Sequence, residues 1–456
     1  MTDAEIKKIF GGKRITLMGL GLLGRGIGDA EFFAEAGAEL IVTDLKSDAD
    51  LGPSMMRLAG FPNIAFHLGG HRMEDFENRD LIVRANNARF DSPYLARARE
   101  RGIPVEMDAS LFAKLSGASL VGVTGTRGKS TVTHLIFAIA KAAGRDPLLG
   151  GNERGMATLP LVRETAPGRL AVLELDSWQL QGFAEDRISP HIAVWNNFMP
   201  DHMDYYRGDM DRYFEDKAAI ARFQKPGDVF IAPPEIAARA AARFGAGAAD
   251  IITDAALPAD WKIALAGEHN RANAGFTLAA ARALGIADEV SRKALENFRA
   301  LPGRLEPVGE KDGIAFYNDS NATTPEAALA ALRALAPAAA RRGGGIVLIA
   351  GGNDKQLSLE AFAEAIPKAA KAAVLIKGTA TEKMRALLPA GYRAPVAESM
   401  EEALREARGA AEPGDIVLLS PGAASFGVFK NEYDRGDQFR NLVSAGGRVE
   451  ETPETG

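Results

Sequence analysis

The chain has 456 residues, of which 46% are hydrophobic and 25% are charged. This balance is ordinary for a globular protein and excludes an intrinsically disordered chain, and roughly 150 residues per domain would give about three domains. The formal net charge of −6 argues against a dedicated nucleic-acid-binding protein, and the lack of cysteine excludes disulfides and thiolate metal sites. No apolar run approaches the roughly 20 residues that span a bilayer, and the N-terminus lacks the apolar core of a signal peptide. We therefore expect a cytoplasmic protein without stable membrane insertion.

The first predicted domain, residues 1–107, opens with a strand at 14–18. The strand runs into the turn Gly19-Leu20-Gly21-Leu22-Leu23-Gly24, then a helix and a second strand at 39–42 that leads to Asp44. This order is typical of a Rossmann dinucleotide-binding unit. From these residues alone, the turn could bind a nicotinamide dinucleotide, bind a different nucleotide, or only allow close packing of the helix. The first possibility would make the protein an NAD-dependent oxidoreductase.

The second predicted domain, residues 108–302, has a strand at 119–123 followed by a glycine-rich loop and an amphipathic helix. Gly125 and Gly128 would let backbone N–H groups approach phosphates, and the helix dipole would add to the attraction. The ammonium group of Lys129 would attract the β- and γ-phosphates, and the hydroxyl of Ser130 would ligate Mg²⁺. The loop departs from the usual Walker pattern because Val123 stands where the first glycine belongs. We expect an ATP-binding P-loop, with a chance glycine-rich turn as the alternative.

Residues suited to metal chemistry follow two later strands of this domain. Glu174 ends a predicted strand at 170–174, where a carboxylate beside a phosphate loop would hold Mg²⁺ or would simply be a solvated strand end. His202 follows a strand at 191–196 and would ligate a metal, hold a carboxylate, or have a structural role. Lys217 falls in a predicted helix at 212–223 and by itself looks like a surface lysine.

The third predicted domain, residues 303–456, has strands predicted at 314–317, 346–349, 374–376 and 416–419, separated by helical patterns. This alternation predicts a parallel, doubly wound sheet. Asn318-Asp319-Ser320 follows the first of these strands and would bind ribose hydroxyls or cap the next helix. The polar tail after Gly446 is expected to be loose. The predicted fold is thus α/β with three domains: a Rossmann-like N-terminal domain, a central P-loop ATPase domain with a parallel sheet, and a Rossmann-like C-terminal domain.

Taken together, these motifs resemble the Mur ligase family, and most closely its D-glutamate-adding (MurD) type. The resemblance covers nearly the whole chain in the family's order. It rests on GLGLLG from Gly19, VTGTRGKST from Val123, GGN from Gly150, ELDSWQLQGF from Glu174, DHMDYY from Asp201, GEHNRAN from Gly267, LPGRLE from Leu301, YNDSNATTPEA from Tyr317, GGNDK from Gly351 and SPGAASFGVFKN from Ser420. The family loop reads TGTxGK[ST], so in this light the missing Walker glycine is expected.

The resemblance implies a set of site residues. ATP would be bound by Gly125, Thr126, Gly128, Lys129, Ser130, Thr131, Asn270, Asn273, Arg304 and Asp319. Two Mg²⁺ ions would be held by Ser130, Glu174, His202 and, if it is carbamylated, Lys217. The UDP-linked substrate would lie near Leu22, Leu23, Asp44, Lys46, Asn152 and His202, and the incoming glutamate near Thr323, Lys355, Ser425 and Phe426. Lys129, Lys217 and His202 would be the catalytic residues.

The implied reaction joins glutamate to UDP-N-acetylmuramoyl-L-alanine (UDP-MurNAc-L-Ala). ATP would phosphorylate the alanine carboxylate, and the amine of glutamate would then displace phosphate from the acyl phosphate. The enzyme would act as a monomer on small molecules, without a nucleic-acid partner. The alternatives are the same chemistry with L-glutamate or another amino acid, another Mur-type or folylpolyglutamate-type ligation, the oxidoreductase, and a non-catalytic nucleotide-binding switch.

The sequence also departs from the family pattern at several positions. Asn321 stands where Lys is usual, Asp176 replaces a Ser, Asn86 and Asn87 stand where Pro-Gly is common, and Glu432 stands where Phe is frequent. These departures bear on the choice of amino acid and on part of the first-domain contact with substrate. They leave the residues of the ATP and Mg²⁺ site intact.

Overall fold

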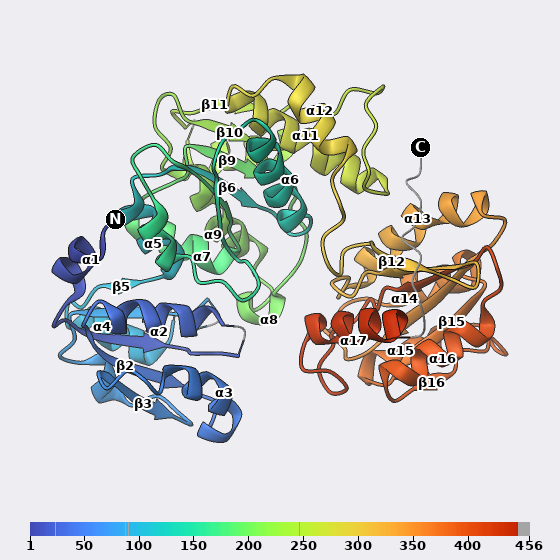
Figure 1. Ribbon diagram of the computed structural model, residues 1–456, viewed down its shortest axis with the longest axis horizontal. Helices are drawn as coiled ribbons and strands as arrows, with labels where there is room; N and C mark the ends of the chain where they lie inside the picture. The colour runs from blue at the N-terminus through green and yellow to red at the C-terminus, as the bar shows by residue number, and fades with distance from the viewer. Residues whose placement is uncertain (23, 87, 90, 246, 446–456) are drawn as a thin grey trace. The chain divides into compact units, whose positions relative to one another are not determined.

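The structure is a computed structural model that describes residues 1–22, 24–86, 88–89, 91–245 and 247–445 (Figure 1). Two compact units make up the chain: Met1–Trp261 with Ala272–Leu295, and Lys262–Arg271 with Glu296–Gly456. Two sheets lie in the first unit and a third lies in the second unit, so the predicted α/β class with three sheets is confirmed. Among the described residues, no helix combines the length and apolar character needed to cross a membrane. The tail after Gly446 lies outside the described residues.

The first sheet is entirely parallel, with strand order β3-β2-β1-β4-β5. Its strands are β1 (Arg14–Met18), β2 (Glu39–Asp44), β3 (Ile64–Leu68), β4 (Leu81–Arg84) and β5 (Val105–Glu106). The helical segments are α1 (Asp3–Phe10), α2 (Arg25–Glu35), α3 (Asp48–Leu58), η1 (Met73–Phe76) and α4 (Pro93–Glu100). This strand order is that of a Rossmann half, which confirms the predicted strand, glycine turn, helix and strand. Phe10, Phe32 and Phe33 pack edge to face in its core.

The second sheet is also parallel, with strand order β11-β10-β9-β6-β8-β7. Its strands are β6 (Ser119–Thr124), β7 (Leu148–Gly151), β8 (Leu170–Glu174), β9 (Ile192–Trp195), β10 (Val229–Ile231) and β11 (Asp250–Ile252). Its helical segments are α5 (Asp108–Ser116), α6 (Lys129–Ala142), η2 (Leu159–Glu164), α7 (Ser177–Asp186), α8 (Met203–Tyr206), α9 (Met210–Arg222) and α10 (Pro234–Phe244), and α11 (Glu268–Ala283) and α12 (Asp288–Glu296) follow.

The register of the second sheet places the candidate site. Val123 of β6 lies opposite Glu174 of β8, and Thr124 lies opposite Trp195 of β9. The three strands therefore end at the same edge, and the glycine loop, Glu174 and the residues after β9 emerge side by side. Ligands of open α/β sheets bind at this carboxyl edge.

The third sheet has the order β12-β13-β17-β14-β15-β16. Its strands are β12 (Glu306–Lys311), β13 (Ile314–Asn318), β14 (Ile346–Gly351), β15 (Ala372–Ile376), β16 (Val396–Ala397) and β17 (Ile416–Leu419). Its helices are α13 (Pro325–Arg341), α14 (Glu360–Ala369), α15 (Thr379–Leu387), α16 (Met400–Ala410) and α17 (Glu432–Ala445).

The prediction of a wholly parallel third sheet is wrong at one edge. β12 runs antiparallel to β13, and all other pairs are parallel. β12 was not predicted because it is polar and contains Pro307 and Gly309, between which its register shifts. A signal was available, since Asp312-Gly313 between the two strands has positive φ at both residues and is a favoured hairpin turn.

Candidate active site

The loop between β6 and α6 has the shape expected of a phosphate-binding loop. Gly128 has φ of +78°, a backbone conformation that residues with a side chain rarely adopt. A β-carbon on Gly128 would come within 2.6 Å of Asn273 Oδ1, and one on Gly125 within 1.8 Å of Asn196 Oδ1. Only glycine at both positions therefore allows these two buried amides to lie against the loop.

Two asparagines after β9 hold this loop in place. Asn197 Oδ1 accepts hydrogen bonds from the backbone N–H groups of Thr126 (3.0 Å) and Arg127 (2.9 Å). The side-chain amides of Asn196 and Asn197 both donate to the carbonyl of Arg127, at 2.8 and 2.9 Å. Sequence reasoning assigned neither residue a role. The available signal was their place as adjacent polar residues at the end of a buried strand beside the loop.

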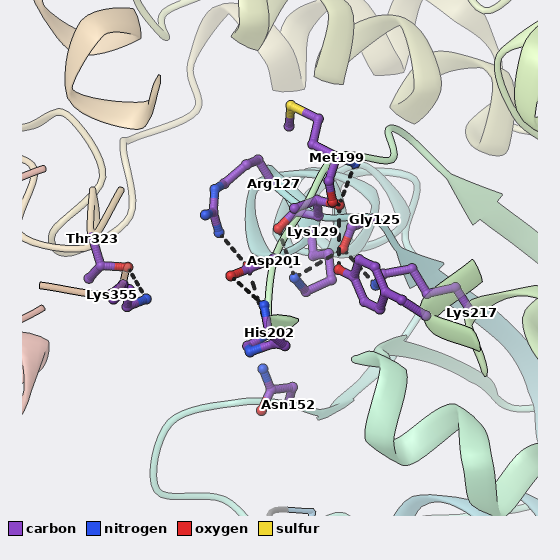
Figure 2. A network of polar contacts seen from close by, with 12 residues as sticks. Gly125, Arg127, Lys129, Asn152, Met199, Asp201, His202, Lys217, Thr323 and Lys355 are labelled. Atoms are coloured by element: carbon purple, nitrogen blue, oxygen red, sulfur yellow. Dashed lines mark hydrogen bonds and ion pairs between the residues drawn. The ribbon is translucent and has the colours of Figure 1, made fainter. Parts of the chain in front are cut away.

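Lys129 begins α6 and reaches back over the loop. Its Nζ donates to the carbonyls of Gly125 (3.2 Å) and Thr126 (3.3 Å), as Figure 2 shows for Gly125. Burial lowers the pKa of Lys129, and the nearby carboxylate of Glu174 acts in the opposite direction. Ser130 and Thr131 follow in the first turn of the helix. The predicted loop, lysine and hydroxyl thus occupy one short strand–loop–helix unit.

Glu174 and Asn152, which were assigned to metal and to substrate, contact each other. Glu174 is 3% exposed, and its Oε1 accepts a hydrogen bond from Asn152 Nδ2 at 3.1 Å. The backbone N–H of Asn152 also donates to the carbonyl of Glu174 at 2.7 Å. The end of β7 is therefore fastened to the end of β8, next to the glycine loop.

His202 lies in a polar cluster with Asp201 and Arg127 (Figure 2). Asp201 Oδ2 is 2.9 Å from Arg127 Nη1 and 3.7 Å from His202 Nε2, and the imidazole packs 4.5 Å from the ring of Trp178. Burial lowers the pKa of His202, opposed by Asp201 and assisted by the positive charge of Lys129. The imidazole is therefore neutral near pH 7, the form that ligates metals and accepts hydrogen bonds.

Lys217 is buried, which contradicts its appearance as a surface lysine. It is 1% exposed, and its Nζ donates to the Gly125 carbonyl (2.9 Å) and to Thr124 Oγ1 (3.2 Å). The reason is that α9 packs on β6 and β9 and directs this side chain under the loop. Burial, together with the charge of Lys129, lowers the pKa of Lys217 well below its ordinary value. Both effects favour the neutral amine over the ammonium form.

Three carboxylates of the first unit lie within electrostatic reach of both lysines. Glu174, Asp176 and Asp201 each act on the pKa of both Lys129 and Lys217, which places all five groups within electrostatic reach of one another. Within the described ranges, no three His, Asp or Glu side chains are gathered closely enough to hold a metal ion by themselves.

That arrangement still fits Mg²⁺. The ion usually takes one or two protein oxygens and fills its other positions with phosphate and water. The Glu174 carboxylate and the Ser130 hydroxyl are oxygen donors of this kind. Glu174 lies opposite Val123, just before the glycine loop, and Ser130 follows the loop in α6.

Two departures from the family pattern contact each other. Asp176 is buried and caps α7, with Oδ1 accepting the Gln179 backbone N–H at 2.8 Å. Its Oδ2 accepts from Asn86 Nδ2 at 3.2 Å. Asn86 follows β4 of the first sheet, so this pair joins the carboxyl edges of the first and second sheets. The two substitutions are mutually consistent, and Asn87 lies outside the described residues.

In the first sheet, Asp44 organises the glycine turn. Its Oδ2 accepts the backbone N–H groups of Leu20 (2.9 Å) and Gly21 (3.0 Å), and its Oδ1 accepts that of Lys46 (2.9 Å). In nicotinamide-binding Rossmann units this carboxylate receives ribose hydroxyls. Here Oδ2 already accepts from the glycine turn and Oδ1 from the backbone after β2, which disfavours the oxidoreductase. Leu22, in the same turn, is 54% exposed, and Leu23 lies outside the described residues.

In the second unit, the residues assigned to glutamate lie on neighbouring loops. Lys355 Nζ donates to Thr323 Oγ1 at 3.0 Å (Figure 2), and both side chains line a small pocket that Gly422 and Ala423 also border. Asn353 and Ala424 exchange two backbone hydrogen bonds of 2.9 Å, which hold the Lys355 loop beside the loop of Ser425 and Phe426. Ser425 is buried, whereas the Phe426 side chain is 62% exposed.

Asp319 joins three segments of the second unit. Its Oδ2 accepts from Ser420 Oγ at 2.8 Å, and its Oδ1 accepts the backbone N–H of Leu305, the residue after Arg304, at 3.1 Å. Burial raises the pKa of Asp319 to about 7. The alternative that Asp319 caps the next helix is wrong, since α13 begins at Pro325 with Thr324 at its cap position.

The two asparagines assigned to ATP lie one turn apart on α11. Asn270 donates to the carbonyl of Ala266 at 2.8 Å within the second unit. Asn273 belongs to the first unit, where its Oδ1 accepts from Asn196 Nδ2 at 3.1 Å beside the glycine loop.

Arg435 was missed by sequence reasoning. It is fully buried in α17, where it donates to Ser320 Oγ (3.0 Å), the Ser320 carbonyl (2.8 Å) and the Ala423 carbonyl (3.2 Å). Burial lowers its pKa to about 10. It thereby holds the loop after β13 against the loop after β17. An arginine in a polar helix carries no local signal of such a role.

Comparison with known proteins agrees with this arrangement. Residues 123–253 match the Mur ligase middle domain, and residues 303–422 match the Mur ligase glutamate ligase domain. The chain is 39% identical over 472 residues to the UDP-N-acetylmuramoylalanine–D-glutamate ligase of Roseiflexus sp. (strain RS-1), covering 95% of this chain and 99% of that protein.

Solved structures share the fold at lower identity. The chain superposes with a TM-score of 0.62 and 18% identity on the UDP-N-acetylmuramate–alanine ligase MurC of Thermotoga maritima, covering 95% of this chain and 100% of that one. On the MurF ligase of the same organism in complex with ADP, the TM-score is 0.58 at 16% identity, with 97% of each chain covered. The chain belongs to the Mur ligase family.

Proposed function

We propose that the protein is an ATP-dependent ligase that adds D-glutamate to UDP-MurNAc-L-Ala through an acyl phosphate, in peptidoglycan precursor synthesis. The observation that carries the proposal is the convergence of Lys129, Lys217, Glu174 and His202 around the glycine loop. The relative at 39% identity supports the choice of substrates. The domains would span residues 1–107, 108–302 and 303–456, and the enzyme would act as a cytoplasmic monomer.

The physical difficulty of the reaction is that a carboxylate must attack a triphosphate that repels it. The ammonium of Lys129 and the N–H groups at the start of α6 would attract the γ-phosphate and orient it for in-line attack. Mg²⁺ held by Ser130 and Glu174 would supply further neutralisation of the phosphate charge. Neutral His202, which packs between Asp201 and Trp178, would accept a hydrogen bond or ligate Mg²⁺ without adding positive charge to the site.

Lys217 would be the residue that carries a carbamate. Carbon dioxide reacts with a neutral amine, and the lowered pKa of the buried Lys217 supports a neutral amine at this position. The product would be an anion beside Lys129, and that anion would serve as a ligand for a second Mg²⁺.

The remaining residues would bind the substrates. The UDP-linked substrate would lie along Leu22, Leu23, Asp44, Lys46 and Asn152. ATP would contact Thr126, Thr131, Asn270, Asn273, Arg304 and Asp319 in addition to the glycine loop. Glutamate would be received by Thr323, Lys355, Ser425 and Phe426, with the Lys355 ammonium paired to a glutamate carboxylate.

The test is to incubate the protein with ATP, Mg²⁺ and UDP-MurNAc-L-Ala, and to compare D-glutamate, L-glutamate and other amino acids. We expect a product of the mass of UDP-MurNAc-L-Ala-D-Glu and one phosphate released per product. Product with L-glutamate alone would refute the amino-acid assignment. Absence of phosphate release with every amino acid would refute the ligase.

A further inference from the structure

Arg25 connects the carboxyl edges of the first and second sheets. It is the first residue of α2, directly after the glycine turn of the first sheet. Its Nη2 donates to Asn152 Oδ1 at 2.9 Å and to the Glu153 carbonyl at 3.3 Å. Asn152 in turn donates from Nδ2 to Glu174 Oε1 at 3.1 Å. A continuous line of hydrogen bonds therefore runs from the turn to the buried carboxylate of the candidate metal site.

This line determines which way the amide of Asn152 faces. A guanidinium can only donate hydrogen bonds, and an ionised carboxylate can only accept them. The carbonyl oxygen of Asn152 must therefore face Arg25, and its NH₂ group must face Glu174. Without Arg25, no other group in the described part of the chain donates to Asn152 Oδ1, and the amide would be able to rotate.

The backbone around Arg25 leaves little freedom for its side chain. A β-carbon on Gly24 would come within 3.1 Å of the Gly155 carbonyl oxygen, and one on Gly28 within 2.8 Å of Ala157 Cβ. The first turn of α2 thus lies directly against the segment that follows Asn152. This close packing fixes the separation between the backbone of Arg25 and that of Asn152, which the Arg25 side chain spans.

Two buried carboxyl groups lie within electrostatic reach of the guanidinium. Asp29, one turn further along α2, is 4% exposed and Asp108 is 3% exposed. Burial raises the pKa of both groups, and the charge of Arg25 opposes that rise. Asp29 Oδ1 and Arg25 Nε are both buried and, among the described residues, without a hydrogen-bond partner. Arg25 therefore lies within electrostatic reach of this acidic pair and in hydrogen-bond contact with Asn152.

We infer that Arg25 is a positioning residue for the UDP-linked substrate, because it fixes the Asn152 amide with its NH₂ group toward the reacting end of the site. The inference rests on the proposed function, in which the substrate extends from the glycine turn to Glu174. The same contact makes Arg25 a determinant of affinity for the sugar–alanine part of the substrate, while UDP alone does not depend on it.

The test uses Arg25→Lys and Arg25→Met, with Arg57→Met as the matched control. Lysine keeps the positive charge beside Asp29 and Asp108 but loses the planar guanidinium, whereas methionine keeps only the stem. Arg57 also contacts α2, through an exposed ion pair with Glu31 at 2.7 Å, and does not reach Asn152. The measurements are kcat, KM for ATP and for UDP-MurNAc-L-Ala, and calorimetric Kd values for UDP and for UDP-MurNAc-L-Ala.

We expect Arg25→Met to raise the KM and Kd for UDP-MurNAc-L-Ala about tenfold, the loss typical of one charge-assisted hydrogen bond. Arg25→Lys should give a smaller rise in the same direction. KM for ATP and Kd for UDP should stay within about twofold of the unsubstituted protein, since Arg25 donates to Asn152 and Glu153 and, among the described residues, not to the glycine loop. Combining Arg25→Met with Asn152→Ala should give no further loss beyond Asn152→Ala alone.

Three results would overturn the inference: an unchanged KM for UDP-MurNAc-L-Ala in both Arg25 variants, an equal rise in KM for ATP, or multiplying effects of Arg25→Met and Asn152→Ala. If Arg25→Met does not fold, Arg25→Lys with its retained charge decides the question. Failure of the unsubstituted protein to form product refutes the proposed function instead. An active protein with unaffected Arg25 variants refutes only the role of Arg25.

Discussion

Replacing Asn197 with alanine should weaken ATP binding without affecting the UDP-linked substrate. The substitution removes three hydrogen bonds to the glycine loop: two that Asn197 Oδ1 accepts and one that Nδ2 donates. Each is worth roughly 0.5–1.5 kcal/mol net, and the half-buried site lets water recover part of the loss. We expect a net cost of about 1.5–3 kcal/mol, which corresponds to a rise of roughly 10- to 100-fold in the Kd for ATP. The backbone carbonyl of Asn197 also accepts from the Thr126 N–H and remains, so the loop keeps one contact to this segment and the protein should still fold.

The assay is calorimetric titration with a non-hydrolysable ATP analogue and Mg²⁺, followed by titration with UDP-MurNAc-L-Ala. Asn63→Ala is the matched control, because Asn63 Nδ2 donates to the carbonyls of Ala34 and Ala38 at the end of α2, away from the glycine loop. This control should lower the melting temperature and leave ATP affinity unchanged. A Kd for the analogue within about twofold of the unsubstituted protein in Asn197→Ala would refute the argument that Asn197 preorganises the loop.

Three further predictions concern buried charges. Lys129→Ala should abolish ligation while leaving calorimetric binding of UDP-MurNAc-L-Ala largely intact, and retained ligation would remove Lys129 from the mechanism. Lys217→Ala should greatly lower turnover, with partial rescue by small carboxylic acids if a carbamate is the working group; an unchanged turnover that small acids do not affect would eliminate that assignment. Asp319, with its pKa raised to about 7 from 3.8, keeps a proton in the folded state that the unfolded chain releases, so stability should fall as pH rises from about 4 to about 7. Asp319→Asn should remove this part of the decline, at most about 4 kcal/mol from 1.36 kcal/mol per pKa unit, and equal pH slopes of melting temperature in both proteins would contradict it.

Local patterns in the sequence determined most of the framework. The strands at 14–18, 170–174 and 416–419 coincide with β1, β8 and β17, because a buried parallel strand reads as a short apolar run between turn residues. The glycine loop and its lysine could also be predicted from the sequence, since they form a short contiguous motif. The structure shows why glycine is needed at Gly125 and Gly128: other groups lie too close for a β-carbon, and both residues have positive φ. The order of the family motifs supplied the expected roles of Glu174 and His202.

Tertiary structure alone decided which side chains act together. Lys217 looks solvent-exposed in its own helix, yet it bonds to Gly125, 92 residues earlier, because α9 packs beneath the loop. Asn197 and Arg435 likewise serve loops distant in sequence, and the contact of Asn86 with Asp176 joins two sheets. The physical reason is that strand formation depends on neighbouring residues, whereas burial of a charge and the choice of its partners depend on segments that only the folded chain brings together.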